Sequence, residues 1–213
     1  MKTKSILAAA LLMAASAASA SAQTVYSVNA VGFVNVVFPP GFTLASNPLE
    51  GATNTVLALF GTGVTNGTSV FKFDGVTGSY TGSTFFFGSW NNPEMSLLPG
   101  EGFFFKNPTV TAITNTFVGN VKQGTLTTPL SAGFTLVGSQ VPQSGLVSTD
   151  LGVPIGNAES VFKFDTTAQA YTGGTFFFGS WGGAGEPVIG VGEGFFVKKV
   201  AAANWTRSFS VNQ

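Results

Sequence analysis

Four acidic residues at repeated positions are the strongest candidates for catalysis in this chain of 213 residues, which has no histidine and no cysteine. Glu101 and Glu193 each stand in a Gly-Glu-Gly motif, and Asp74 and Asp165 each end a Val-Phe-Lys-Phe-Asp run. Without His and Cys, Ser-His-Asp hydrolysis, thiol chemistry and the usual zinc sites are excluded. Only carboxylate chemistry remains.

The two glutamates could hydrolyse a glycosidic bond if both carboxyl groups faced the same bond of a substrate. The alternative is a structural turn, in which the flanking glycines allow unusual backbone angles and the acid stays solvated before an aromatic strand. A duplication copies a turn residue as readily as a catalytic one. We therefore expect Glu101 and Glu193 to be turn residues.

The two aspartates suggest an aspartic-protease dyad, which also arises by duplication. That dyad requires Asp-Thr/Ser-Gly after an apolar strand, whereas the chain has Asp-Gly-Val at 74 and Asp-Thr-Thr at 165. Aspartate commonly starts a turn because its side chain accepts hydrogen bonds from the turn backbone. We expect Asp74 and Asp165 to be structural turn residues. Too few acids lie near either one for a strong calcium site, so no metal and no cofactor are expected.

A second kind of site is suggested by tyrosines and tryptophans at repeated positions. Such rings can form a stacking platform for sugars, as in carbohydrate-binding modules, or they can pack in the core with their polar atoms at the surface. Packing is favoured, because these residues lie inside apolar strands rather than in loops. The candidate stacking residues are Tyr80, Trp90, Tyr171 and Trp181.

All of these candidates belong to a long internal repeat. The stretch TSVFKFDGVTGSYTGSTFFFGSW (68–90) matches ESVFKFDTTAQAYTGGTFFFGSW (159–181) at 16 of 23 positions. GFTL recurs at 41 and 133, an offset of 92, and GEGFFFK at 100 is answered by GEGFFVK at 192. Such a period indicates two copies of one structural unit.

The same offset places Phe209 at the position of Phe117, so the final FSVNQ resembles the opening of a third copy. Each unit would then be completed by the opening strand of the following copy. The N-terminal strand Thr24–Asn29 has no preceding unit to complete. Either the two ends are satisfied within one molecule, or this strand inserts into the second unit of another molecule, displaces the C-terminal fragment and joins chains head to tail by strand addition. We favour the second arrangement.

Local patterns predict mostly β-structure. VFKFD alternates apolar and polar residues and is followed by turn residues and a returning strand, as in a hairpin. One short helix per unit is expected, at 54–61 and at 146–152, each ended by glycine.

The aromatic strands are apolar on both faces, since side chains alternate along a strand. In TFFFGSW, Phe85 and Phe87 should point one way, and Phe86 and Trp90 the other. One face can fill the core of its own unit. The other must meet the second unit, the helix or another molecule.

The order GFTLASNPL, short helix, VFKFD, Tyr, Trp and PGEGFFF resembles an uncharacterised family of secreted bacterial repeat proteins. The resemblance covers nearly the whole chain after residue 22 and implies an all-β core. It implies no catalytic residues. The second unit departs from the pattern with GSQVP where the first has SNPLE.

Export is expected from residues 1–22, which read as a signal peptide. Two lysines precede a short apolar run, and Ala20-Ser21-Ala22 has the small-x-small form of a cleavage site. Removing Lys2 and Lys4 from nine basic and nine acidic residues leaves seven and nine, a net charge of about −2. This charge gives no reason to expect nucleic acid as a partner, and no later stretch has the roughly 20 apolar residues of a membrane helix.

Taken together, the sequence predicts an all-β protein of two pseudo-symmetric units of about 92 residues, each a β-sandwich or barrel-like and each with one short helix. The expected boundaries are a signal peptide at 1–22, unit 1 at 23–115, and unit 2 with an extra C-terminal strand at 116–213. We expect a secreted, non-enzymatic structural protein, extracellular or at the cell surface, with the periplasm as the alternative. Its expected partners are copies of itself or a surface polysaccharide, the latter if it is a carbohydrate-binding module.

Cleavage after Ala22 should leave Gln23 at the N-terminus of the exported protein, because small residues at 20 and 22 fit the signal peptidase. The intact mass of the exported protein measures this directly. A mature species that retains residues 1–22 would contradict it.

Overall fold

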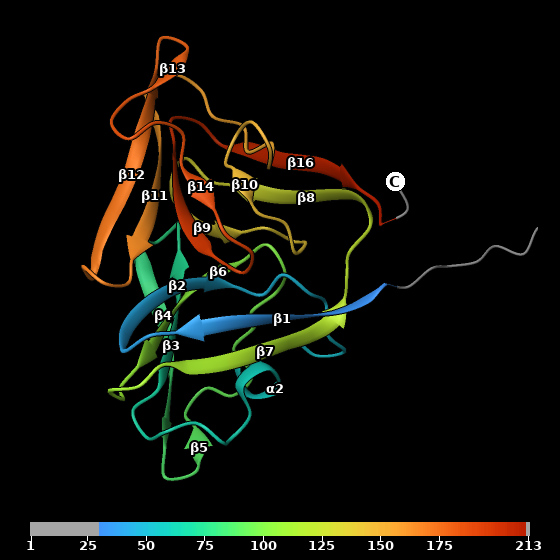
Figure 1. Ribbon diagram of the computed structural model, residues 1–213, viewed down its shortest axis with the longest axis vertical. Coiled ribbons are helices and arrows are strands. Elements are labelled where there is room, and N and C mark those ends of the chain that lie inside the picture. The colour runs from blue at the N-terminus through green and yellow to red at the C-terminus, as the bar shows by residue number, and fades with distance from the viewer. Residues whose placement is uncertain (1–29, 212–213) are drawn as a thin grey trace, which may run out of the picture.

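The computed structural model describes residues 30–211, whose regular secondary structure is antiparallel β-strand apart from one short helix, and it confirms the all-β prediction (Figure 1). The expected signal peptide and the strand Thr24–Asn29 lie outside the described residues. Among the residues described, no helix is long and apolar enough to cross a membrane.

Two five-stranded sheets form the body of the protein. The first sheet has the order β2-β6-β3-β4-β5, and the second has the order β9-β15-β11-β12-β13. Strands in the same place of the two orders carry the repeated motifs, so both copies pair in the same way. The bounds are β2 Gly41–Ser46, β3 Ser69–Asp74, β4 Ser79–Phe86, β5 Ser89–Trp90, β6 Gly102–Asn107, β9 Gly133–Gly138, β11 Glu159–Asp165, β12 Ala170–Phe177, β13 Ser180–Trp181 and β15 Gly194–Lys199.

A two-stranded ribbon packs on each sheet and makes it a sandwich. β1 (Val31–Phe38) pairs with β7 (Ile113–Asn120), and β8 (Gly124–Leu130) pairs with β16 (Ala203–Phe209). Phe38 and Phe117 enter the core of the first sheet, and Leu130 and Trp205 enter the core of the second. A small further pair, β10 (Gly145–Leu146) with β14 (Val188–Ile189), lies beside the second core (Figure 1).

The strands that contain Phe117 and Phe209 each form the second strand of a two-stranded ribbon. β7 runs across the expected boundary between residues 115 and 116 and pairs with β1 from Val31↔Asn120 to Phe38↔Ile113. β16 likewise pairs with β8 along its whole length, from Ala203↔Leu130 to Phe209↔Gly124. Both strands therefore find their partners within the same molecule.

Of the two expected helices, one is present among residues 30–211. α2 (Val56–Phe60) starts after Thr55, whose side chain accepts a hydrogen bond from the amide of Ala58, and it ends at Gly61 with φ of 60°. The prediction for 146–152 is wrong, because this segment forms turns. Its amides at Ser148 and Thr149 are bonded to the carboxylate of Glu186.

The prediction of two-faced strands is confirmed for β6 and β15. Phe103 and Phe105 lie in the core of the first sheet, whereas Phe104 points the other way and packs against Phe196 of the second sheet. On β15, Phe195 and Val197, on either side of Phe196, likewise face the core of the second sheet. Each sheet thus buries one face under its ribbon, and the centre of its other face, at Phe104 or Phe196, packs against the opposite sheet.

The prediction for TFFFGSW is wrong at the hairpin tip. Phe85 and Trp90 are both in the core, while Phe86 and Phe87 are exposed. The strand stops at Phe86, and a two-residue turn of Phe87 and Gly88, with φ of 50° and 84°, reverses the chain. Simple alternation fails here because the turn interrupts it.

A buried ion pair distinguishes the second sheet from the first. Glu159 and Lys199 pair with side chains only 7% and 5% exposed, and Glu159 also accepts hydrogen bonds from the amides of Gly156 and Val200. Burial raises the pKa of Glu159, but these hydrogen bonds and the Lys199 charge outweigh it and lower the pKa below its ordinary value. The equivalent places in the first sheet hold Thr68 and Asn107.

Lys199→Ala should destabilise the protein by roughly 3–5 kcal/mol in urea unfolding, because it leaves the Glu159 carboxylate buried without its counter-charge. The matched control is Glu159→Thr with Lys199→Asn, which introduces the residues found at the equivalent places of the first sheet. Its free energy of unfolding should fall far less. Since the pKa of Glu159 is lowered on folding, its stabilisation is present above the ordinary glutamate pKa and disappears as the pH falls through the folded value. The double variant should therefore lose less stability than the parent on acidification. Equal losses would contradict the assignment.

Candidate functional site

Ten aromatic rings gather where the two sheets meet, and we call them the aromatic cluster. Each sheet contributes five, from equivalent strands. Phe104 and Phe196 are buried in its centre, and the others are half-buried or exposed at its surface. The cluster consists of Phe42, Phe71, Phe73, Tyr80 and Phe104 from the first sheet and Phe134, Phe162, Phe164, Tyr171 and Phe196 from the second.

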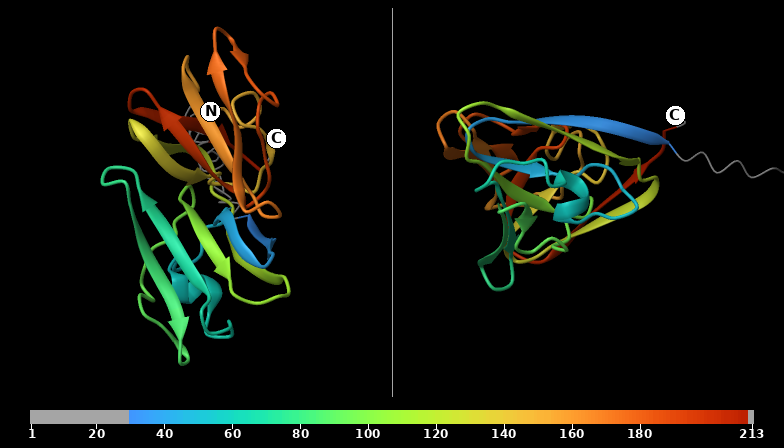
Figure 2. Two further views of the ribbon diagram at one scale, coloured as in Figure 1. Left: turned by 90° about the vertical axis from the view of Figure 1, so that its left-hand side faces the viewer. Right: turned by 90° about the horizontal axis from the view of Figure 1, so that it is seen from below.

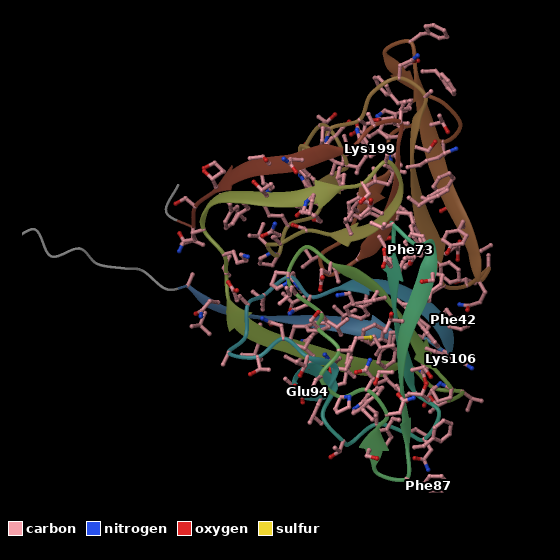
Figure 3. All side chains as sticks on the ribbon, turned by 180° about the vertical axis from the view of Figure 1, so that it is seen from behind. Phe42, Phe73, Phe87, Glu94, Lys106 and Lys199 are labelled. Atoms are coloured by element: carbon pink, nitrogen blue, oxygen red, sulfur yellow. The ribbon has the colours of Figure 1, made fainter. Side chains whose placement is uncertain are left out.

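Equivalent rings of the two sheets make equivalent contacts with the opposite sheet. Phe73 meets Phe196 edge-on with centroids 5.3 Å apart, and Phe164 meets Phe104 in the same way at 5.4 Å. Edge-to-face pairs of this kind are favourable beyond the area they bury. Figure 3 shows Phe42 and Phe73 on the side of the molecule formed by the sheets. The sheets are therefore joined by side-chain packing of matched rings.

Two open clefts lie on the surface of the cluster. The first has a volume of about 340 Å³ and is lined by Phe73, Tyr80, Phe134, Phe162, Tyr171 and Phe196. The second, of about 520 Å³, is lined by Phe42, Phe71, Tyr80, Phe104, Phe164 and Gln169. Most lining residues of one cleft are the repeat equivalents of those of the other. Gln169 is the one polar amide among them.

Tyr80 and Tyr171 meet between the clefts and are each about half exposed, at 48% and 51%. Burial of its ring, together with the charge and the hydroxyl of Tyr80, raises the pKa of Tyr171 to about 12. Burial raises the pKa of Tyr80 as well, although its hydrogen bond with Tyr171 acts in the opposite direction. Both hydroxyls therefore stay protonated at neutral pH.

The rims of the clefts carry lysines and a hairpin turn. Lys106 lies over the ring of Phe42 and Lys198 over the ring of Phe134, each 5.8 Å from the centroid. Gln169, in the turn between β11 and β12, accepts from the amide of Phe42 at 2.7 Å and donates to its carbonyl at 3.0 Å. This amide fastens the tip of one sheet's hairpin to the edge strand of the other sheet.

The structure separates the tryptophans from the tyrosines proposed with them as stacking residues. Trp90 is 4% exposed in the core of the first sheet, and its indole nitrogen donates to the carbonyl of Gly61 at 2.7 Å. Trp181 is half-buried and packs against Phe176. Only Tyr80 and Tyr171 of the four reach the clefts. The sequence could not predict which phenylalanines line the clefts, because each cleft combines residues of both repeats.

The two glutamates close equivalent turns and pair with equivalent lysines. Glu101 accepts from the amide of Leu98 at 2.7 Å and from Lys72 at 2.8 Å. Glu193 accepts from the amide of Gly190 at 2.7 Å and lies 3.2 Å from Lys163. Every carboxylate oxygen of Glu101 and Glu193 thus has a partner within its own repeat.

The Gly-Glu-Gly motifs also bind the two sheets to each other. The amide of Ser46 donates to the carbonyl of Gly192 at 2.9 Å, and the amide of Gly138 donates to the carbonyl of Gly100 at 3.2 Å. A Cβ at Gly194 would lie 2.5 Å from the carbonyl oxygen of Ala45. Glycine is needed there because the edge strand of the other sheet comes too close for any side chain.

Both aspartates start their hairpin turns. Asp74 accepts from the amides of Val76 and Thr77 at 2.8 and 3.2 Å. Asp165 likewise accepts from the amides of Thr167 and Ala168 at 2.8 and 2.9 Å. These backbone hydrogen bonds lower the pKa of both carboxyl groups. Asp74 and Glu101 line one further, more polar cleft of about 610 Å³. The residues described contain no group of three acids placed to hold a metal ion.

The fold, seen from two further sides in Figure 2, is that of an antiparallel β-sandwich protein. Its candidate site is the aromatic cluster with its two clefts. Comparison of the chain with models of known protein families, with curated proteins and with solved structures gives no match.

Gly194→Ala should destabilise the protein by roughly 1–3 kcal/mol, because the added methyl group would overlap the backbone of Ala45 and force the sheets apart. Gly63→Ala is the control, since a Cβ there meets nothing within 4 Å and its effect should stay within about 0.5 kcal/mol. Urea unfolding followed by tryptophan fluorescence measures both. Equal effects of the two substitutions would show that the close approach is unimportant.

Proposed function

We propose that this protein is an exported, non-enzymatic structural protein of the cell surface or extracellular matrix, and that it assembles with copies of itself through the aromatic cluster. The observation that carries the proposal is the pair of open clefts lined almost wholly by aromatic rings. Exposed apolar patches of this kind mark interaction sites. The internal repeat presents the surface twice, as a protein that joins several neighbours requires.

The lining of the clefts suits protein side chains better than sugars. A sugar site places polar groups around its stacking rings to bind the hydroxyls of the ligand. Here Gln169 is the polar amide of the lining, and both ends of its side chain are already bonded, to Phe42 and Thr166. An apolar ligand such as a phenylalanine or leucine side chain needs no such partners.

The acidic residues do not support hydrolysis. A glycosidase needs one carboxyl group that stays protonated near neutral pH. The pKa values of Asp74 and Asp165 are lowered, and both oxygens of Glu101 are occupied by an amide and a lysine. These are the properties of turn residues.

Side-chain contact is a better route to assembly than strand addition. An incoming strand would have to displace β16, which is paired with β8 over seven residues. It would also expose Trp205, which is 2% exposed and donates to the carbonyl of Leu151 at 2.8 Å. The clefts, by contrast, are open without any rearrangement.

Carbohydrate binding is the second candidate, on the strength of the half-exposed rings of Tyr80 and Tyr171. Aromatic faces of this kind can stack on sugar rings. A surface polysaccharide would then be the partner.

Replacing Phe42 and Phe134 with Asp should shift the sedimenting species of the mature protein from large assemblies toward the monomer. Each ring lines one cleft, and an apolar partner would have to bury the new carboxylate. Val110→Asp with Val200→Asp is the control, since it adds the same charge at exposed loop positions. A parent that stays monomeric at high concentration, or that binds polysaccharide through the clefts instead, would overturn the proposal.

A further inference from the structure

The two Phe-Phe-Gly hairpin tips are exposed without any structural need for an aromatic ring. Phe87 and Phe178 are 95% and 94% exposed, and they follow Phe86 and Phe177, which are about half exposed. Each terminal ring lies beside its neighbour, at 6.4 Å between centroids. The tips are therefore four phenyl rings presented to solvent in two equivalent pairs.

The backbone at these tips makes phenylalanine an unfavourable choice. Phe87 and Phe178 have φ of 50° and 47°, and the following glycines have φ of 84° and 85°. Two-residue turns with positive φ at both positions favour Asn-Gly or Asp-Gly. A phenylalanine there is strained and exposed, so it weakens the fold rather than stabilising it.

Other features hold the tips in place. The amide of Phe87 donates to the side chain of Asn66 at 3.1 Å, and that of Phe178 donates to the side chain of Asn157 at 2.9 Å. In the other hairpin of each sheet, all four turn residues differ between the repeats, GVTG in one and TTAQ in the other. The Phe-Phe-Gly tips are identical.

The tips lie at opposite ends of the molecule. β5 and β13 mark the two ends of its longest axis in Figure 1, and Phe87 stands at one end in Figure 3, away from Phe42 and Phe73. A tip therefore cannot reach a cleft of its own molecule. Residues 30–211 thus present two open aromatic clefts and two exposed aromatic tips.

We propose that the Phe86–Phe87 and Phe177–Phe178 tips of one molecule insert into the aromatic clefts of another copy. This inference rests on the proposed function and names its contact. The two clefts have volumes of about 340 and 520 Å³, within the range of roughly 300–1,000 Å³ typical of pockets that hold small molecules. The tips and the cleft linings contain no charged residue, although Lys106 and Lys198 lie on the rims. The near-zero net charge of the chain does not keep copies apart.

The contact is small and repeated. Two rings bury at most roughly 300–500 Å² on the side of the tip, at 150–250 Å² per ring. A stable interface buries about 800 Å² per partner, so one contact alone is weak. A chain with two tips and two clefts can take part in four such contacts, and tip-to-cleft contacts are heterologous, so they propagate from molecule to molecule.

Phe87→Asn with Phe178→Asn removes the terminal rings and supplies the residue that the turn prefers, so the fold should be retained. This tip variant should sediment as a monomer at concentrations where the parent forms assemblies. Circular dichroism and urea unfolding should show stability equal to or above that of the parent. A tip variant that assembles like the parent overturns this inference but leaves the proposed function standing, whereas a monomeric parent overturns both.

Mixing provides the decisive test. The tip variant keeps its clefts, and the Phe42→Asp, Phe134→Asp variant keeps its tips. Each variant should therefore be monomeric alone, whereas an equimolar mixture of the two should assemble. A mixture that stays monomeric when the parent assembles contradicts the insertion of tips into clefts. Binding of the parent to phosphatidylcholine vesicles that is lost in the tip variant, with assembly unchanged, would assign the tips to a lipid contact instead and overturn the inference.

Discussion

The packing of Phe104 against Phe196 is the contact on which the arrangement of the two sheets depends. These rings lie 6.4 Å apart at the centre of the aromatic cluster, on strands whose other faces fill the two cores. A strand that is apolar on both faces cannot be left at the surface, so each sheet needs the other as a cover. No disulfide is available to do this, since the chain has no cysteine. The reciprocal hydrogen bonds at Gly100 and Gly192 then fix how the covering sheets are aligned.

Much of this fold can be predicted from the alternation of side chains along the strands. Alternation in GEGFFFK predicts the opposite directions of Phe103 and Phe104, and the hairpins follow from VFKFD with its turn residues. The errors arise where a local pattern competes with a tertiary contact. Phe87 breaks the alternation because a tight turn begins there, and the segment 146–152 forms turns whose amides are bonded to a carboxylate 38 residues away in sequence.

Less of the candidate site than of the fold could be predicted from the sequence. Tyr80 and Tyr171 could be singled out by residue type, but Trp90 and Trp181 have the same signature and lie elsewhere. The clefts combine rings from strands far apart in the chain, and the contacts between sheets that create them have no local signal. The pairing of Phe73 with Phe196 depends on how two separately patterned sheets meet, which periodicity does not specify.

Gln169 makes the two halves of the molecule unequal. The first repeat has Gly78 at the equivalent turn position, so only one hairpin fastens itself to the opposite edge strand by a side-chain amide. One cleft has this amide on its rim and is larger than the other. The two repeated hairpins therefore make different contacts with the opposite sheet. An array built through both clefts would therefore contain two unequal contacts, which can form and break at different rates.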